Sequence, residues 1–545
     1  MARSASLAPG LSQRRVDALG TRAAVAASHP SIAFEGARVL ADGGNAIDAT
    51  LAMAAVGWMV LPGQCGIGGD AFAVVREPDG RVWTVNGSGF GADGATPELF
   101  REQGLTAIPM TGAISVTVPG AAAAIATLAQ QASRPLGDLW QAGISLGRNG
   151  FPCTAKTRAD IGEHLQALLN DPGTRSAFAP QGRLPGVGER LFQPDLADFI
   201  TALAKDPNAF YVGRFAEQAV ACLVAGGAPF SGQEWALGAD APSQPAISQT
   251  YGGGTLHQTP LPTPGWMVLQ QAALCDGVLS QVDQLGADAV HWLASAARTA
   301  FTDRFAFCSS DNDGWRTALD PSRVQESRSR IGAVTAPDPQ PLEGVRTAGD
   351  TTSTVCVDGE GRAVSFIHSL AFTFGARLTV PGTGVLLNNR LGRGAYLIDG
   401  HPNEVRPRRK PLHTLNAWVY DNDALGLLHV GSCPGGDGQV QWNMQVLSHL
   451  VDHGATPQEA VAMPRLTVSP GSDSNVLGHP EELRCEPGLD PATLGRLRGW
   501  GHNVVEVPDQ VGGPGGSAMA ISLDHTNGTL AAGADPRMEG IALAL

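Results

Sequence analysis

Residues 350–359, with the sequence Asp-Thr-Thr-Ser-Thr-Val-Cys-Val-Asp-Gly, constrain the fold of this chain more than any other stretch. The run 354–357, the turn signal Asp358-Gly359 and the apolar run 363–367 together predict a β-hairpin. This hairpin would hold Thr351 at the start of a rigid strand. Threonine is common in strands because of β-propensity alone. If the preceding bond is cut, however, its hydroxyl can attack a carbonyl while its own α-amine takes the proton.

The length and composition predict a compact globular protein without nucleic-acid or membrane partners. The chain has 545 residues, of which 43% are hydrophobic and only 16% charged, so a large core can be buried. Its net charge of −14 argues against nucleic acid, because phosphate binding needs a basic surface. The most apolar run, 46–61, is too short to cross a bilayer and contains Asp48, so we expect a buried helix there.

The eight cysteines and the N-terminus predict a cytoplasmic protein. No two cysteines are spaced as Cys-x-x-Cys, which argues against zinc ribbons and thioredoxin-like redox sites. Scattered cysteines in a chain of this size are typical of buried thiols in a reducing compartment. Arg14-Arg15 is not followed by an apolar run, so we expect no secretion signal. We predict no metal ion and no cofactor.

Hydrophobic periodicity predicts strands in both halves of the chain with helices between them, which is typical of a sheet sandwich flanked by helices. Asn45 can cap one helix, and residues 136–237 have a mainly helical pattern. Pro, Asp and Gly dominate 333–348 without an apolar period, which indicates an exposed linker leading to Asp350-Thr351. The main expected elements are helices 31–40, 46–61, 121–131, 265–278, 287–305 and 439–449, and strands 71–75, 81–85, 518–521 and 530–532.

The glycine-rich stretch 66–69 is not a dinucleotide-binding fingerprint. That motif places its glycines before a helix, whereas these glycines precede the expected strand 71–75. We therefore expect close backbone packing at this point.

Short blocks of sequence along nearly the whole chain resemble the γ-glutamyltransferase family of N-terminal-nucleophile hydrolases. They occur in the order in which that family has them. In the first half the blocks are 26–30, 43–49, 66–69, 115–120, 291–294 and 300–304. In the second half they are Asp350-Thr351-Thr352, Pro381-Gly382-Thr383-Gly384, Leu386-Leu387-Asn388-Asn389, Pro434-Gly435-Gly436 and Asp535-Pro536-Arg537.

The resemblance implies an α+β fold, the four-layer αββα sandwich of the N-terminal-nucleophile hydrolases. It implies that the precursor cuts itself between Asp350 and Thr351. The products would be a large subunit of residues 1–350 and a small subunit of residues 351–545, intertwined in a single domain. Thr351 would be the catalytic nucleophile.

The resemblance also implies roles for three other catalytic residues. Gly435 and Gly436 would supply backbone N–H groups to an oxyanion hole, and the hydroxyl of Ser369 would bond to the nucleophile. Without the resemblance, the two glycines indicate a helix-start turn and Ser369 an ordinary strand serine. A helix start can itself bind an anion through its N–H groups, so the two interpretations of the glycines are compatible.

The sequence departs from the family pattern where a γ-glutamyl group would bind. The arginine that holds the substrate α-carboxylate has no evident counterpart after Val85, and Ala371 replaces an asparagine. Arg390 and Arg393 follow Asn389, where an acid should grip the substrate ammonium. A cation there repels an ammonium and attracts a carboxylate. The alternative for both arginines is a solvent-exposed loop.

A further departure is His413-Thr414, which replaces the paired serines of the transferases. These features resemble the branch of the family that contains glutaryl-cephalosporin acylases and oxamate amidohydrolase, and they point to substrate-binding roles for His413 and Thr414. His413 is alternatively a structural histidine.

The sequence thus predicts a self-cleaving amidohydrolase that forms an acyl-enzyme on Thr351. The expected substrate is the oxamate- or glutaryl-like amide of a small carboxylated acyl group. One alternative is a true γ-glutamyltransferase or glutathione hydrolase with a rearranged pocket. Another, from a different class, is an unprocessed binding protein without catalytic activity.

Overall fold

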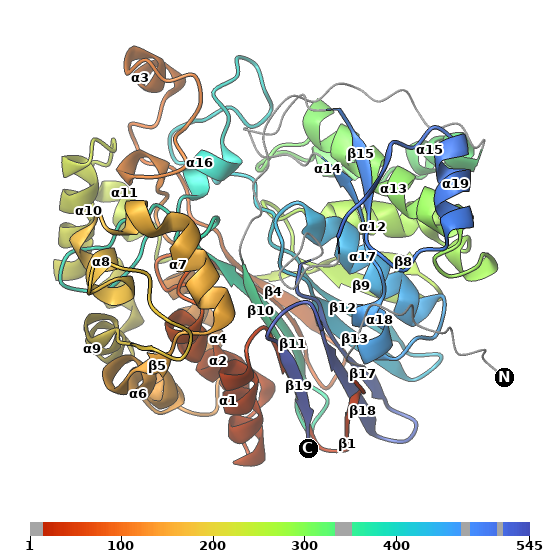
Figure 1. The fold of residues 1–545 in the computed structure, drawn as a ribbon, viewed down its shortest axis with the longest axis horizontal. Helices are drawn as coiled ribbons and strands as arrows, with labels where there is room; N and C mark the ends of the chain where they lie inside the picture. Colours follow the sequence, from red (N-terminus) through yellow and green to blue (C-terminus); the bar gives the residue numbers. More distant parts are fainter. Residues whose placement is uncertain (1–14, 333–350, 470–479, 509–515) are drawn as a thin grey trace.

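Two seven-stranded sheets packed face to face form the centre of the molecule. The computed structural model describes residues 15–332, 351–469, 480–508 and 516–545. Helices cover the outer face of each sheet, the orange and yellow ones on one side and the green and blue ones on the other (Figure 1). This arrangement confirms the predicted four-layer αββα sandwich.

The first sheet interleaves strands from both sides of the expected cleavage point. β10 and β11, which follow Thr351, lie between β2 and β3 from the first half of the chain, and every neighbouring pair is antiparallel. In spatial order the strands are β19 (Ile541–Ala544), β2 (Ala24–Ala27), β10 (Thr352–Val357), β11 (Ala363–Ser369), β3 (Asp70–Arg76), β4 (Val82–Gly87) and β7 (Ser243–Pro245).

The second sheet is also antiparallel throughout. In spatial order its strands are β1 (Ala18–Gly20), β18 (Thr529–Ala534), β17 (Met519–Asp524), β13 (Leu427–Ser432), β12 (Ala417–Asn422), β9 (Gly254–Gln258) and β8 (Ile247–Tyr251). A smaller sheet consists of β14 (Leu466–Ser469), β15 (Glu482–Cys485) and β16 (Val504–Glu506), and β5 (Phe151–Pro152) pairs with β6 (Arg190–Leu191).

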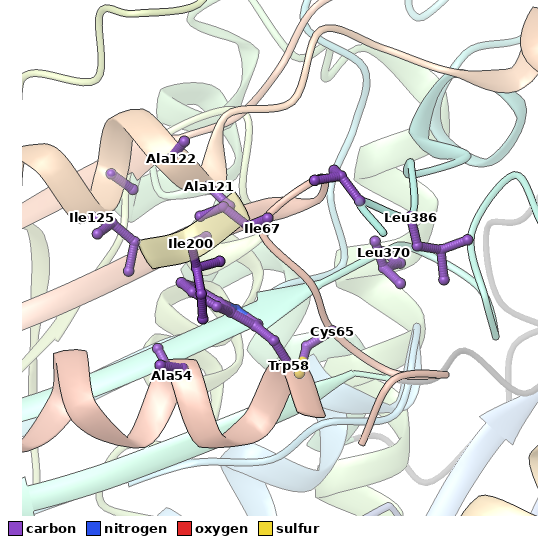
Figure 2. Packing of buried hydrophobic residues seen from close by; sticks show 14 of the residues in the cluster. Ala54, Trp58, Cys65, Ile67, Ala121, Ala122, Ile125, Ile200, Leu370 and Leu386 are labelled. Carbon is purple, nitrogen blue, oxygen red and sulfur yellow. The ribbon is translucent and has the colours of Figure 1, made fainter. Parts of the chain in front are cut away.

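Alternation along the strands creates three separate hydrophobic layers. In β10, Val355 and Val357 point between the two sheets, while Cys356 points toward the helices. In β12, Val419 packs between the sheets and Trp418 faces the other helical layer. Because successive strand side chains point to opposite faces, each central strand contributes to two cores at once. Figure 2 shows part of the core beneath the first sheet, where Trp58 meets residues from several segments.

The helices fall into two groups. Against the first sheet lie α1 (Pro30–Ala41), α2 (Ala46–Val60) and α4 (Ala121–Ala129), and beyond them α3 (Pro97–Glu102), α5 (Leu136–Leu139), α6 (Gln141–Asn149), α7 (Ala155–Leu168), α8 (Pro172–Phe178), α9 (Pro194–Leu203), α10 (Arg214–Ala225) and α11 (Gln233–Leu237). Against the second lie α12 (Gly265–Cys275), α17 (Gly438–Val451) and α18 (Pro457–Ala462), and beyond them α13 (Ala287–Ala306), α14 (Gly314–Ala318), α15 (Pro321–Gly332) and α19 (Pro491–Gly499). Within the described ranges, none of the helices is long and apolar enough to cross a membrane.

Most of the elements expected from the sequence are confirmed. The hairpin forms with Thr352 opposite His368, and Asn45 caps α2 through a reciprocal pair of hydrogen bonds with Asp48. β1 and β19 were not predicted. β19 has the sequence Ile-Ala-Leu-Ala, without a turn or β-branched pattern of its own, and it is a strand because it pairs with β2 at the sheet edge. The linker predicted at 333–348 lies outside the described residues.

All eight cysteines are unpaired. Seven are buried and Cys222 is half-buried, in agreement with the prediction of buried thiols.

Candidate active site

Thr351 and Ser369 meet at one end of the hairpin. Thr351 immediately precedes β10 and is only 4% exposed, and Ser369 is the last residue of β11. The Thr351 Oγ1 hydroxyl donates a hydrogen bond of 3.1 Å to Ser369 Oγ. The strand register explains the contact, because the pairing of Thr352 with His368 brings the next residue of each strand side by side. Asp350, the other residue of the predicted cleavage site, lies outside the described residues.

Gln64, which no motif in the sequence marks, bonds to residues on both sides of this contact. Its side-chain Oε1 accepts a hydrogen bond of 2.9 Å from the Thr352 hydroxyl. Its backbone oxygen accepts another, of 3.2 Å, from the N–H of Leu370. A polar residue in the otherwise apolar turn after α2 was the only signal available in the sequence.

The glycine stretch after Gln64 packs against the same point. A Cβ placed on Gly69 would lie 2.3 Å from the Ser369 backbone oxygen, and one on Gly68 would lie 2.2 Å from that of Leu386. No side chain fits at either position. The expectation of close backbone packing is therefore confirmed.

Gly435 and Gly436 lie in the loop that follows β13 of the second sheet, at the same end of the sandwich as Thr351. They lie between β13 and α17, with φ values of +136° and +59° that favour glycine. The Ser353 hydroxyl contacts Met519 Sδ at 3.7 Å, and Met519 is the register partner of Ser432, the last residue of β13. The loop that follows Ser432 therefore starts level with the first residues of β10.

A helix from the first half of the chain holds this loop. Arg304 of α13 forms a buried ion pair of 3.1 Å with Asp437, the residue after Gly436. Its other terminal nitrogen donates to the backbone oxygen of His413 at 3.4 Å. Arg304 thus joins the glycine loop to the segment that carries His413-Thr414.

Arg390 is fully buried and paired with Asp70. Arg390 Nε lies 3.0 Å from Asp70 Oδ2, and neither side chain is exposed to solvent. The other carboxylate oxygen, Oδ1, accepts a hydrogen bond of 2.9 Å from the N–H of Gly89. Burial raises the pKa of Asp70 above its usual range, although the Arg390 guanidinium opposes this shift.

Arg393 lies one step from the Thr351–Ser369 contact. Ser369 Oγ accepts a hydrogen bond of 2.9 Å from the N–H of Ala371, and Arg393 Nη1 donates one of 2.8 Å to the Ala371 oxygen. The guanidinium also stacks 4.3 Å from the centre of the Phe372 ring. Both arginines belong to the buried helix α16 (Arg390–Gly394), so the alternative of a solvent-exposed loop is wrong.

His413 is fully buried. Its Nε2 shares a hydrogen bond of 2.9 Å with Ser88 Oγ, and its ring packs edge-on against Phe72 with 4.8 Å between centroids. Four cationic side chains also act on its pKa through their charge: Arg390, Lys410, Arg393 and Arg304. Burial, followed by these charges, holds the pKa of His413 well below its ordinary value, so the imidazole is neutral at pH 7. Among the described residues, His413 Nδ1 and Thr414 Oγ1 have no hydrogen-bond partner.

The structure thus brings the sequence-predicted residues to one edge of the sandwich. Thr351, Ser369 and Arg393 are linked through Ala371, and the loop carrying the two glycines starts at the same edge. Arg390 and His413 lie beside the neighbouring strands of the first sheet. Arg390 contacts Asp70, the first residue of β3, and His413 contacts Ser88, which directly follows β4.

The four-layer sandwich places the chain in the class of N-terminal-nucleophile hydrolases. The family model described as Gamma-glutamyltranspeptidase matches residues 33–545, so the chain belongs to the γ-glutamyltranspeptidase family. The resemblance seen in the sequence is confirmed, and the chain is an enzyme of the amidohydrolase and acyltransferase kind found in this family.

Three relatives illustrate the range of the family. The "Glutathione hydrolase-like YwrD proenzyme" of Bacillus subtilis is 30% identical over 535 residues, covering 97% of this chain and 99% of the relative. The "Oxamate amidohydrolase proenzyme" of Klebsiella pneumoniae is 31% identical over 541 residues, covering 96% and 98%. The crystal structure of cephalosporin acylase from Bacillus halodurans superimposes with a TM-score of 0.88 at 28% identity, covering 100% and 99%.

We expect the Asp70→Asn variant to lose stability, because it removes the carboxylate charge that pairs with the buried Arg390 guanidinium. Breaking a buried pair in this way typically costs about 3–5 kcal/mol. Asp42→Asn is the matched control, since Asp42 forms an exposed pair with Arg38 on α1 and should contribute at most about 1 kcal/mol. Urea unfolding followed by circular dichroism measures both. Equal losses in the two variants would contradict a special role for the buried pair.

Proposed function

We propose that this chain is a self-cleaving amidohydrolase that forms an acyl-enzyme on Thr351. The observation that carries the proposal is the hydroxyl of Thr351, buried at the start of a central strand and hydrogen-bonded to Ser369. The B. subtilis and K. pneumoniae relatives are both named as proenzymes, which supports maturation by cleavage.

Self-cleavage would begin with attack of Thr351 Oγ1 on the carbonyl carbon of Asp350. The acyl group moves from the nitrogen to the oxygen of Thr351, giving an ester, and water then hydrolyses this ester. The products are the carboxyl group of Asp350 and the free α-amine of Thr351. Residues 1–350 and 351–545 become two chains, and the interleaved strands of the first sheet would keep them together.

Turnover would use the new α-amine as the general base. It takes the proton of Oγ1 as the oxygen attacks the substrate amide carbonyl, and this proton then passes to the leaving amine. The N–H groups of Gly435 and Gly436 would stabilise the oxyanion, by about 3 kcal/mol each. Ser369 would orient the nucleophile. Water attacks the resulting ester, releases the acid and restores Thr351.

The charges around the site favour an acyl group that carries a carboxylate and no amine. Arg393 lies beside the Thr351–Ser369 contact, and it is the best candidate for the carboxylate. Arg390 is a weaker candidate, because Asp70 already compensates its charge. His413 Nδ1 and Thr414 Oγ1 could bond to the substrate directly, since neither has a partner among the described side chains. Oxamate, which is the amide of an oxalyl group, and glutaryl amides meet these requirements.

A γ-glutamyl substrate is the second candidate, favoured by the name of the B. subtilis relative. It would require the substrate ammonium to bind near the cations whose charge lowers the pKa of His413.

We also propose the cytoplasm as the compartment, because all eight thiols are unpaired.

We expect the purified protein to consist of two chains, the smaller beginning at Thr351. Thr351→Ala should fold but remain a single inactive chain, because it lacks the hydroxyl that both cleavage and turnover need. Thr351→Ser should cleave, since it keeps the hydroxyl. Intact-mass analysis after prolonged incubation measures all three proteins. Maturation of the Ala variant would assign the nucleophile elsewhere, with Thr352 the next candidate.

We expect glutaryl-p-nitroanilide or oxamate to be a better substrate than γ-glutamyl-p-nitroanilide. At an effective dielectric near 20, an ammonium about 4 Å from one like charge costs about 4 kcal/mol, or roughly a thousandfold in kcat/KM. Arg393→Asp should narrow the ratio of kcat/KM for the glutaryl over the γ-glutamyl substrate, because an anion there repels the carboxylate and attracts the ammonium. General damage to the enzyme would lower both kcat/KM values equally and leave their ratio unchanged.

Arg498→Asp is the matched control for this experiment. It makes the same change of charge at a half-exposed position on α19 and should leave the substrate ratio unchanged. A wild-type preference for γ-glutamyl-p-nitroanilide would contradict the proposed acyl group.

A further inference from the structure

The indole ring of Trp442 fills the space beside three glycines. They are Gly435 in the candidate oxyanion loop, Gly438 at the start of α17 and Gly516, which precedes β17. A Cβ built on Gly435 would lie 2.2 Å from Trp442 Cζ3, and one on Gly438 would lie 2.2 Å from Cη2. Gly516, whose Cβ would lie 2.2 Å from the Pro434 oxygen, would meet the ring at 2.6 Å. The ring therefore occupies the position of three absent side chains, and the backbone of the loop rests on it.

Trp442 is itself held against β14. Its Nε1–H donates a hydrogen bond of 2.9 Å to the Thr467 hydroxyl. Two glutamines on the same helix bond to the backbone of β14 on either side of Thr467. Gln441 bonds to the N–H and oxygen of Val468 at 2.7 and 3.0 Å, and Gln445 to those of Leu466 at 3.1 and 2.8 Å. Helix and strand are thus joined at three consecutive residues.

The Asp535-Pro536-Arg537 motif anchors the residue before β14. Asp535 pairs with the buried Arg465 at 2.5 Å and accepts a hydrogen bond of 2.9 Å from the N–H of Ala518. Arg537 bonds to both Asp535 and Glu486, and the N–H of Arg465 donates to Glu486 at 3.0 Å. The N–H of Ser517, next to Ala518, donates in turn to the Pro434 oxygen at 3.4 Å. A buried, charge-paired cluster therefore also supports the loop through Ser517.

We infer that Trp442 is a positioning residue that fixes the peptide planes of Gly435 and Gly436. The inference rests on the proposed function, in which these two N–H groups bind the oxyanion. Trp442 acts through the loop and does not touch the substrate. Both acylation and deacylation pass through an oxyanion, so a displaced loop slows both steps together and changes KM little.

The test compares Trp442→Phe with a matched buried tryptophan. Trp235, on α11 in the other helical layer, is fully buried and donates one hydrogen bond of 2.9 Å to the Phe210 oxygen. Trp235→Phe therefore removes the same atoms and the same kind of bond. We expect kcat for glutaryl-p-nitroanilide or oxamate to fall about 10- to 100-fold in Trp442→Phe, the cost of a displacement near 1 Å, with KM within about threefold. In Trp235→Phe, kcat should stay within about twofold of the wild type.

The hydrogen bond to Thr467 gives a second, milder test. Thr467→Val should lower kcat in the same direction, whereas Thr467→Ser should restore it, because serine keeps the acceptor. Equal kcat values in Trp442→Phe and Trp235→Phe would overturn the inference, as would a Thr467→Ser variant no better than Thr467→Val. A rapid burst of p-nitroaniline from the wild type tests the proposed function separately. Its absence, together with an active Thr351→Ala variant, would count against the acyl-enzyme and not against Trp442.

Discussion

The pairing of β10 with β11 is the interaction on which the candidate site depends. Its register brings the residue before β10 beside the last residue of β11, so Thr351 meets Ser369 without any flexible loop between them. Gln64 binds to the neighbour of each residue and so resists a slip of the register. A one-residue slip would turn every side chain of the strand to the opposite face and separate the two hydroxyls.

The proposed chemistry needs groups from both sheets and from both halves of the chain. β11 contributes Ser369 and the segment after it supports Arg393 through Ala371, whereas the candidate oxyanion loop follows β13 on the other sheet. Arg304, from the first half, ties that loop to the His413 segment. The sandwich therefore acts as a rigid frame in which ion pairs and close glycine contacts set the positions of short loops.

Much of this arrangement follows from local sequence, and the remainder depends on distant contacts. The hairpin and its threonine were predictable because strand, turn and strand follow one another directly. The partner of Arg390 was not, since Asp70 lies 320 residues away and nothing local marks it. Burial of Arg390 and Arg393 was also unpredictable, because a polar sequence such as Arg-Leu-Gly-Arg resembles an exposed loop until its counter-charges are known. Trp442 has an ordinary core pattern, and its role depends on glycines from two segments that are distant in the sequence.

The central claim is that Thr351 carries the acyl group during turnover. The most direct measurement is peptide mapping by mass spectrometry of enzyme quenched in acid during turnover of glutaryl-p-nitroanilide or oxamate. The account predicts an acyl mass on the first peptide of the small chain, attached to Thr351 and absent from Thr351→Ala. An acyl group on any other residue, or a fully unmodified small chain during rapid turnover, would contradict it.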